Sequence, residues 1–229
     1  MTVLKILYMN PNCRSPLERA GVLSEQAVLR WDRGERIVKK NWADAFRCTI
    51  DGIGTVYVKR YFPQRNRLLG AFRQNLAIRE YTCSATLQWL GVPQAEPVLA
   101  AVVKDCFGLV SCGLYMMREV RDAVSLDILL ERMQAAPDRG LLEAIAGELV
   151  RLLEVMHGGG FCHWDLKPRN LLVSQEAGRV VITPIDARSG KTIRVFRRRA
   201  CIERDWRFLL REPLLKPLFE KRFEAKGCV

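Results

Sequence analysis

Hydrophobic and polar residues alternate along residues 35–61, and this two-residue period is typical of half-buried β-strands. The clearest stretch is "TVYVKRYF", which is rich in β-branched and aromatic residues. Its alternation places Val56, Val58 and Arg60 on one face of a strand, and Thr55, Tyr57 and Lys59 on the other. We predict three antiparallel strands here, with "DGIG" as a turn, and two more strands around "PVLAAVV" and "GLVSCGLYMM".

Apolar residues recur at three- and four-residue steps in the segments that we expect to be helical. One such segment covers residues 75–90 and is followed by the stop signal "GVP". The clearest one is "DRGLLEAIAGELVRLLEVMHGGG", in which three consecutive glycines end the helix. Shorter helices are expected in "SLDILLERMQ", where Ser125 is a candidate N-cap, and in "ERDWRFLLRE".

The order of these elements predicts an α+β chain with two lobes. Strands with one helix occupy residues 30–118, and helices dominate residues 119–229. Residues 1–29 are expected to form an N-terminal arm, either as a strand or as another ordered segment. A polar stretch near residues 118–124 separates the lobes, and ligand sites often lie at such boundaries.

The most informative motif is "HWDLKPRNLLV", in which several polar residues stand directly before an apolar run. A capped turn before a buried strand would explain these polar residues without any chemistry. The spacing also resembles H-R-D-L-x-x-x-N, the catalytic loop of protein kinases, with Trp164 in place of Arg and with matches at His163, Asp165, Leu166 and Asn170. We therefore predict a two-lobed protein-kinase-like fold with a β-rich N-lobe and a shortened helical C-lobe.

Phosphoryl transfer needs the residue types that this motif provides. Asp165 could orient and deprotonate an attacking hydroxyl, Lys167 could neutralise charge on the transferred group, and the Asn170 carbonyl could hold Mg²⁺. A second metal-binding acid is expected after the next strands, and Asp186 in "PIDARSG" stands sixteen residues beyond Asn170. The turn residues "SQEAG" predict a hairpin that brings Asn170 and Asp186 together, although only the Asp of the kinase D-F-G motif is present.

Lys59 in "VYVKR" matches the strand lysine of protein kinases, and Glu80 in the following helix is its expected partner in gripping the nucleotide phosphates. A lysine between lobes needs such a partner because burying an unpaired charge is costly. The plain alternatives are a surface lysine on an edge strand and a solvated glutamate beside Arg79. No G-x-G-x-x-G motif covers the phosphates, and "KKNWADAF" stands in its place.

Composition limits the compartment and the partners. Lys and Arg exceed Asp and Glu to give a net charge of +12, but no nucleic-acid reading module is recognisable, so no nucleic-acid partner is expected. The eight cysteines lack C-x-x-C spacing, which is typical of buried thiols in a reducing compartment. No signal peptide or membrane-spanning run is recognisable, so a cytoplasmic protein is expected. His157 and His163 are expected to have structural roles, His163 by bonding the loop backbone.

The chain resembles the lipopolysaccharide kinase family over residues 30–210, on "VYVKRY", "REYTCSATLQWLGVPQAEPV", "MHGGGFCHWDLKPRNLLV" and "PIDARSG". The resemblance implies ATP and Mg²⁺, a Kdo or heptose hydroxyl of the lipopolysaccharide inner core as acceptor, and work at the cytoplasmic face of the inner membrane. Transferred by position, the roles are nucleotide binding by Lys59 and Glu80, a base at Asp165, and metal binding by Asn170 and Asp186. These side chains are expected to converge on one nucleotide–magnesium complex.

Two rival functions are alternatives to a sugar kinase. Only 43 residues follow Asp186 and they contain no A-P-E segment, which leaves little room for a peptide platform and argues against an atypical Ser/Thr protein kinase. The missing glycine loop and the altered D-F-G are the evidence for a nucleotide-binding pseudokinase or scaffold.

The basic tail allows two interpretations. Arg197, Arg198 and Arg199 either bind an acidic acceptor or an anionic membrane, or form the solvated face of a closing helix.

Overall fold

The computed structural model describes residues 2–63, 75–193 and 198–225. These residues form two compact units, the first made of residues 1–82 and 95–119 and the second of residues 83–94 and 120–229. The predicted boundaries at residues 29/30 and 118/119 remain predictions.

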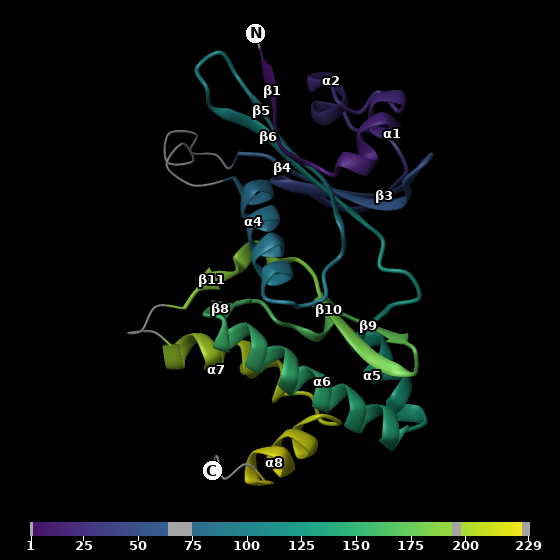
Figure 1. Cartoon of the computed structure of the whole chain (residues 1–229), viewed down its shortest axis with the longest axis vertical. Coiled ribbons are helices and arrows are strands. Elements are labelled where there is room, and N and C mark those ends of the chain that lie inside the picture. Colours follow the sequence, from purple (N-terminus) through teal and green to yellow (C-terminus); the bar gives the residue numbers. More distant parts are fainter. Residues whose placement is uncertain (1, 64–74, 194–197, 226–229) are drawn as a thin grey trace. The chain divides into compact units, whose positions relative to one another are not determined.

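The first unit is built on one six-stranded antiparallel sheet, coloured purple to teal in Figure 1. The strand order is β1-β5-β6-β4-β3-β2. The strands are β1 (Val3–Met9), β2 (Glu35–Lys40), β3 (Ala43–Ile50), β4 (Gly54–Tyr61), β5 (Pro97–Lys104) and β6 (Val110–Arg118). The five strands expected between residues 35 and 118 all form, and the N-terminal segment adds a sixth at the edge beside β5.

The two faces of β4 differ as its alternation predicts. Val56 and Val58 are fully buried in the core of the first unit. Helices α1 (Arg14–Arg19) and α2 (Glu25–Leu29) contribute Leu17 and Val28 to the same core. The residues expected to form an arm are therefore an integral part of this unit, because their apolar side chains complete its core.

Arg60 lies on the buried face of β4, where its charge is fully paired. Its guanidinium makes two bonds to the Asp44 carboxylate, at 2.6 and 2.9 Å, and donates to the backbone oxygens of Val28 and Leu29. A bidentate carboxylate satisfies the planar guanidinium better than a single contact. The pair thus ties the end of α2 to the middle of the sheet.

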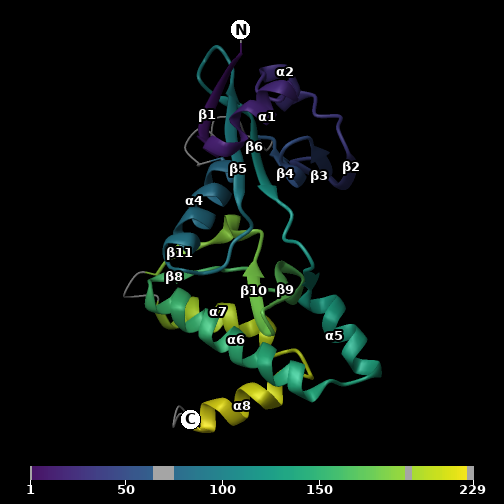
Figure 2. The same ribbon diagram turned by 45° about the vertical axis from the view of Figure 1, so that its right-hand side comes forward.

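The second unit packs helices around a hairpin. The long helix α6 (Arg139–Gly158) is preceded by Asp138, whose side chain caps it by accepting from the Leu141 N–H. Helix α6 lies against β10 (Arg179–Pro184), which pairs with β9 (Leu171–Glu176), as Figure 2 shows. The other helices are α5 (Leu126–Ala135), α7 (Arg198–Leu209), α8 (Lys216–Ala225) and the last part of α4 (Leu76–Trp89). The predicted helices and hairpin are confirmed.

Several short elements position the loops of the second unit. They are β7 (Val124–Ser125), β8 (Phe161–Cys162), β11 (Lys191–Thr192), η2 (Pro168–Asn170) and η3 (Ala187–Ser189); a further 3₁₀ turn, η1 (Pro11–Cys13), belongs to the first unit. Strand β11 pairs with β8, so Lys191 lies opposite Cys162.

The cysteines behave as the composition predicts. Of the seven that the structure describes, none forms a disulfide and all but Cys106 are buried, while Cys228 lies outside the described residues. Burial raises the pKa of the Cys112 thiol to about 12, so this side chain stays protonated at neutral pH. Within the described part of the chain, no helix has the length and apolar character needed to cross a bilayer.

Candidate active site

In the first unit, Lys59 and Glu80 form the ion pair that the sequence predicts. Strand β4 lies between β6 and β3, so Lys59 is not on an edge strand. The Lys59 side chain is 15% exposed and that of Glu80 only 2%. Tyr61, which shares the face of Lys59, donates its hydroxyl to the other Glu80 oxygen. Both carboxylate oxygens are therefore engaged, and the Lys59 ammonium is fixed at its place on the sheet.

In the second unit, the loop before β9 gathers three predicted residues. Lys167 Nζ lies 2.6 Å from Asp165 Oδ1, and both side chains keep some exposure to solvent. Asn170 Nδ2 donates to the Asp165 backbone oxygen at 2.8 Å and lies 3.4 Å from Asp165 Oδ2. The amide is thereby oriented with its NH₂ group toward Asp165, which leaves its Oδ1 as the atom available to bind a cation.

The β9–β10 hairpin brings Asp186 to this loop. Leu171 pairs with Pro184 at the open end of the hairpin, and the Ile185 N–H donates to the Asn170 backbone oxygen at 2.8 Å. Asp186 follows in a left-handed conformation, with φ 62°, and Arg188 Nη1 donates to its Oδ1 at 2.8 Å. Asp tolerates this conformation better than most residues. The predicted convergence of Asn170 and Asp186 within the second unit follows from this register.

Asn170 Oδ1 and the Asp186 carboxylate fit a hard divalent cation. Both are oxygen donors, and one belongs to an amide whose orientation is fixed by Asp165. The Arg188 guanidinium donates to Oδ1 of this Asp186 carboxylate and holds it at the end of the hairpin. This donor set suits a hard divalent cation, and its identity as Mg²⁺ stays a prediction.

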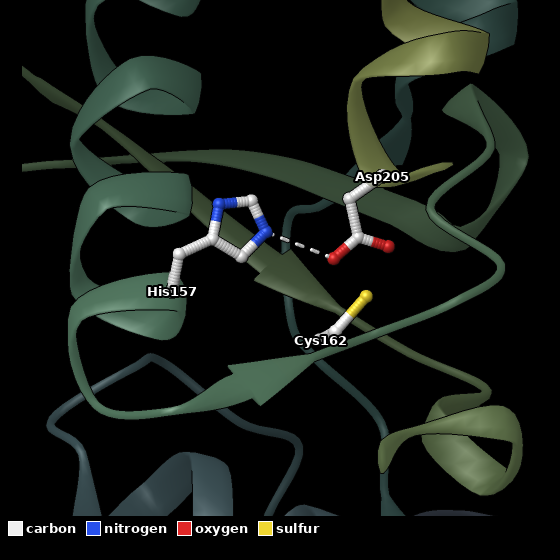
Figure 3. Close-up of side chains that lie close together, drawn as sticks. All are labelled: His157, Cys162 and Asp205. Atoms are coloured by element: carbon white, nitrogen blue, oxygen red, sulfur yellow. Dashed lines mark hydrogen bonds and ion pairs between the residues drawn. The ribbon is translucent and has the colours of Figure 1, made fainter. Parts of the chain in front are cut away.

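Asp205 of α7 organises the backbone that leads into the loop of Asp165, Lys167 and Asn170. Its Oδ2 accepts from the His163 N–H at 2.9 Å, and its Oδ1 accepts from the Trp164 N–H at 2.7 Å. His157 Nε2 at the end of α6 lies 3.1 Å from Oδ2, as Figure 3 shows. Asp205 is fully buried. No periodicity in α7 marks this residue, and its partners stand 41, 42 and 48 positions earlier, so the sequence did not indicate it.

Cys162 of β8 completes the cluster of Figure 3, with its ligand atom within 4.8 Å of those of His157 and Asp205. Its thiol donates to the Cys201 backbone oxygen at 3.0 Å. Burial, reinforced by the Asp205 charge, raises the pKa of the Cys162 thiol, so the thiolate needed by a metal is disfavoured. Both Asp205 oxygens already accept backbone N–H groups. This cluster is therefore a hydrogen-bonded support of the loop rather than a metal centre.

Trp164, which replaces the kinase Arg, has a left-handed backbone with φ 70°. This conformation costs a bulky residue about 1–3 kcal/mol. It is held by Asp205 at its N–H and by Arg204, whose Nε donates to its backbone oxygen at 3.0 Å. The loop is thus locked by two neighbouring residues of α7.

Two of the three tail arginines lie within the residues that the structure describes. Arg197 lies outside the described residues. Arg198 and Arg199 open α7 and are exposed, and Arg199 pairs with Glu203 at 2.7 Å. For these two residues the solvated-face interpretation of the tail fits the structure.

Comparison with known proteins decides the family. The model of the Lipopolysaccharide kinase (Kdo/WaaP) family matches residues 55–225. The chain belongs to the Kdo/WaaP lipopolysaccharide kinase family. It is therefore a kinase that transfers the γ-phosphate of ATP to a sugar in lipopolysaccharide core biosynthesis, with the use of a divalent metal that this class shares. The assignment favours a sugar kinase over the two rivals, a protein kinase and a pseudokinase.

Solved structures confirm the fold. The structure of WaaP in complex with acyl carrier protein is similar with a TM-score of 0.60 and 17% identity, covering 98% of this chain and 96% of that one. The BubR1 kinase domain is similar with a TM-score of 0.52 and 14% identity, covering 71% of this chain and 47% of that one. No curated protein matches the chain in sequence. The protein-kinase-like fold predicted from the motif is confirmed.

Asp205→Ala is expected to lower the free energy of unfolding of this family member by about 3–5 kcal/mol, because it leaves buried donors of three residues without their acceptor. The kcat should fall as well, since the backbone before Asp165 loses its anchor. Urea unfolding and steady-state kinetics measure the two effects. Glu203→Ala, at an exposed position of the same helix, serves as the control; an equal loss in both variants would contradict the assignment.

His163 should make the enzyme less stable below about pH 6.5. Its Nε2 donates to the Ile185 oxygen at 3.1 Å, and Nδ1 has no hydrogen-bond partner among the described residues. Burial lowers the pKa of His163 below the ordinary value of 6.5, because protonation would charge the core. The unfolded chain thus binds the extra proton first, and the free energy of unfolding should fall as pH drops below 6.5, by up to about 1.4 kcal/mol per pH unit.

The measurement is urea unfolding at several pH values for the wild-type enzyme and for His163→Gln. The amide can still donate to the Ile185 oxygen but does not titrate. The difference between the two pH profiles isolates His163 from other groups. Parallel profiles between pH 5 and pH 7 would show that the histidine is not buried in its neutral form.

Proposed function

We propose that this kinase transfers the γ-phosphate of Mg-ATP to a hydroxyl of Kdo or heptose in the lipopolysaccharide inner core. The observation that supports this best is the register of the second unit, in which the Ile185–Asn170 bond places the Asp186 segment beside the loop that holds Asp165. A base, a lysine and two oxygen ligands on adjacent segments are the parts that phosphoryl transfer needs.

Asp165 would act as the base. Its carboxylate orients the sugar hydroxyl for attack and accepts the hydroxyl proton as the new O–P bond forms and the bond to the ADP oxygen breaks. Lys167 Nζ lies 2.6 Å from Asp165 Oδ1, so Asp165 Oδ2 is the oxygen that would take the proton. The same lysine would neutralise negative charge that develops on the transferred group.

Asn170 and Asp186 would hold Mg²⁺, which when bound neutralises charge on the phosphate oxygens. The chain's own contribution is to keep these ligands in place. Asp165 fixes the Asn170 amide, and the left-handed backbone at Asp186 sets the direction in which its carboxylate leaves the hairpin.

Lys59 would bind the nucleotide phosphates while Glu80 holds it in position. We propose that this pair and the residues of the second unit act on one ATP molecule. The two-residue turn between β2 and β3, Asn41 and Trp42, would supply backbone N–H groups in place of a glycine-rich loop. The acceptor would be an inner-core glycolipid at the cytoplasmic face of the inner membrane, whose anionic surface suits a chain with a net charge of +12.

Phosphorylation of a purified acceptor tests the proposal. The enzyme is incubated with Mg-ATP and deacylated core oligosaccharides that contain Kdo alone or Kdo with heptose, and ³¹P NMR locates the new phosphate. A phosphate monoester on either sugar is the expected result, and its loss on chelation of the metal should be reversed by Mg²⁺. Transfer to protein alone, or ATP hydrolysis without any sugar product, would contradict the proposal.

A further inference from the structure

Two cations lie against the ring of Trp164. Lys191 Nζ is 3.7 Å from the ring centroid, and the Arg204 guanidinium carbon is 4.5 Å from it. The two charges are therefore no more than about 8 Å apart. The pairing of β11 with β8 places Lys191 here, and the bond from Arg204 to the Trp164 oxygen fixes the guanidinium. Strand pairing thus sets the position of Lys191 on the backbone, and a hydrogen bond orients the Arg204 side chain.

Within the described ranges, no carboxylate is paired with either of these two cations. Among the residues that the structure describes, neither Lys191 nor Arg204 forms an ion pair. The acidic side chains nearby in sequence are engaged elsewhere: Asp165 with a lysine, Glu203 with an arginine one turn earlier, and Asp205 with backbone N–H groups. The indole face stabilises a cation only modestly. Two like charges at this separation repel each other, and an anion that contacts both would remove the repulsion.

Lys191 and Arg204 contact the residue next to Asp165, which is the residue proposed to bind the acceptor hydroxyl. Trp164 directly precedes Asp165, and adjacent α-carbons lie about 3.8 Å apart across a trans peptide bond. An anion held at the Trp164 ring would thus be bound by the residue that directly precedes the proposed base in sequence. We propose that Lys191 and Arg204 bind an anionic oxygen group of the acceptor sugar, a carboxylate or a phosphate, beside the hydroxyl that is phosphorylated. The inference rests on the proposed function and favours a sugar acid such as Kdo over a neutral heptose.

Kinetics with matched acceptors test this site. Lys191→Gln removes one charge at an exposed position and leaves the backbone pairing of β11 intact. It should raise KM for a Kdo-containing oligosaccharide about tenfold or more, with KM for ATP unchanged. Arg204→Gln should act in the same direction, and Arg204→Lys, which keeps the charge, should lose less. Lys216→Gln and Arg151→Gln, exposed and remote in sequence, control for the change in net charge and should leave both KM values unchanged.

Altered acceptors identify the anion. If it is a carboxylate, reduction of the Kdo carboxylate to an alcohol should raise KM for the wild type, and Lys191→Gln should add nothing further. If it is a phosphate, removal of the acceptor phosphates should instead raise KM for the wild type, and Lys191→Gln should again add nothing further. Equal KM values for the Lys191→Gln variant and the wild type, or an equal loss with charged and neutral acceptors, would overturn the inference.

A binding measurement separates this inference from the proposed function. Free Kdo and inorganic phosphate are titrated into the wild type and Lys191→Gln by calorimetry, which needs no turnover. Weaker anion binding by the variant supports the anion site even if no sugar is phosphorylated, in which case the proposed function alone fails. Sugar phosphorylation with anion binding that does not depend on Lys191 would leave the proposed function standing and overturn the site.

Discussion

Asp165→Ala is expected to lower kcat by about 10²–10⁴-fold, because the sugar hydroxyl loses the group that orients it and accepts its proton. The free energy of unfolding should change by less than about 1 kcal/mol, since Asp165 is partly exposed and Lys167 can be solvated in its absence. The backbone oxygen of Asp165, which Asn170 also contacts, is retained in the variant. Steady-state kinetics with Mg-ATP and core oligosaccharide, together with urea unfolding, measure both quantities.

Asp165→Asn sharpens the test of the base. The amide keeps the shape of the carboxylate but cannot accept a proton at neutral pH, so its kcat should be as low as that of the alanine variant. Glu176→Ala, at the exposed end of β9, controls for the loss of one negative charge. Retention of a tenth or more of the wild-type kcat by Asp165→Asn would show that the base lies elsewhere.

Lys59→Met is expected to lower kcat/KM for ATP by about 10²-fold or more, since it removes a fixed positive charge from the transferring phosphates. It should also lower the free energy of unfolding by about 3–5 kcal/mol, because the Glu80 carboxylate is left buried with Tyr61 as a donor and without a cation. Kinetics at varied ATP concentration and urea unfolding report the two effects separately.

The double variant Lys59→Met/Glu80→Gln distinguishes the catalytic role of the pair from its structural role. Removal of both charges should restore part of the stability lost in Lys59→Met, but none of the kcat/KM for ATP. Arg79→Ala tests the alternative partner of Glu80 and should change neither quantity by a comparable amount. Recovery of activity in the double variant would reduce Lys59 to a structural residue.

Local patterns in the sequence account for most of the fold. The alternation along β4 predicts which side chains are buried, since a strand turns successive residues to opposite faces. The apolar stripe of α6 likewise predicts the helix and its buried face. The same patterns place Lys59 on the face opposite Val56, and the turn between β9 and β10 predicts the approach of Asn170 and Asp186.

The contacts that support the site could not be predicted, because they join segments far apart in sequence. Asp205 holds the backbone of His163 and Trp164 from a helix whose pattern gives no sign of it. The left-handed backbone of Trp164 depends on these same bonds, so no local propensity indicates it. The cations against the Trp164 ring reach it through the pairing of β11 with β8 and through the fold of α7.

A crystal structure of the enzyme with Mg²⁺ and a non-hydrolysable ATP analogue tests the central claim most directly. The account predicts one Mg²⁺ ion held by the Asn170 side-chain oxygen and the Asp186 carboxylate, with Lys59 Nζ within hydrogen-bond distance of the phosphates of the same nucleotide and Asp165 near the γ-phosphate. A nucleotide that binds without contact to Lys59, or a metal held by other residues, would contradict it.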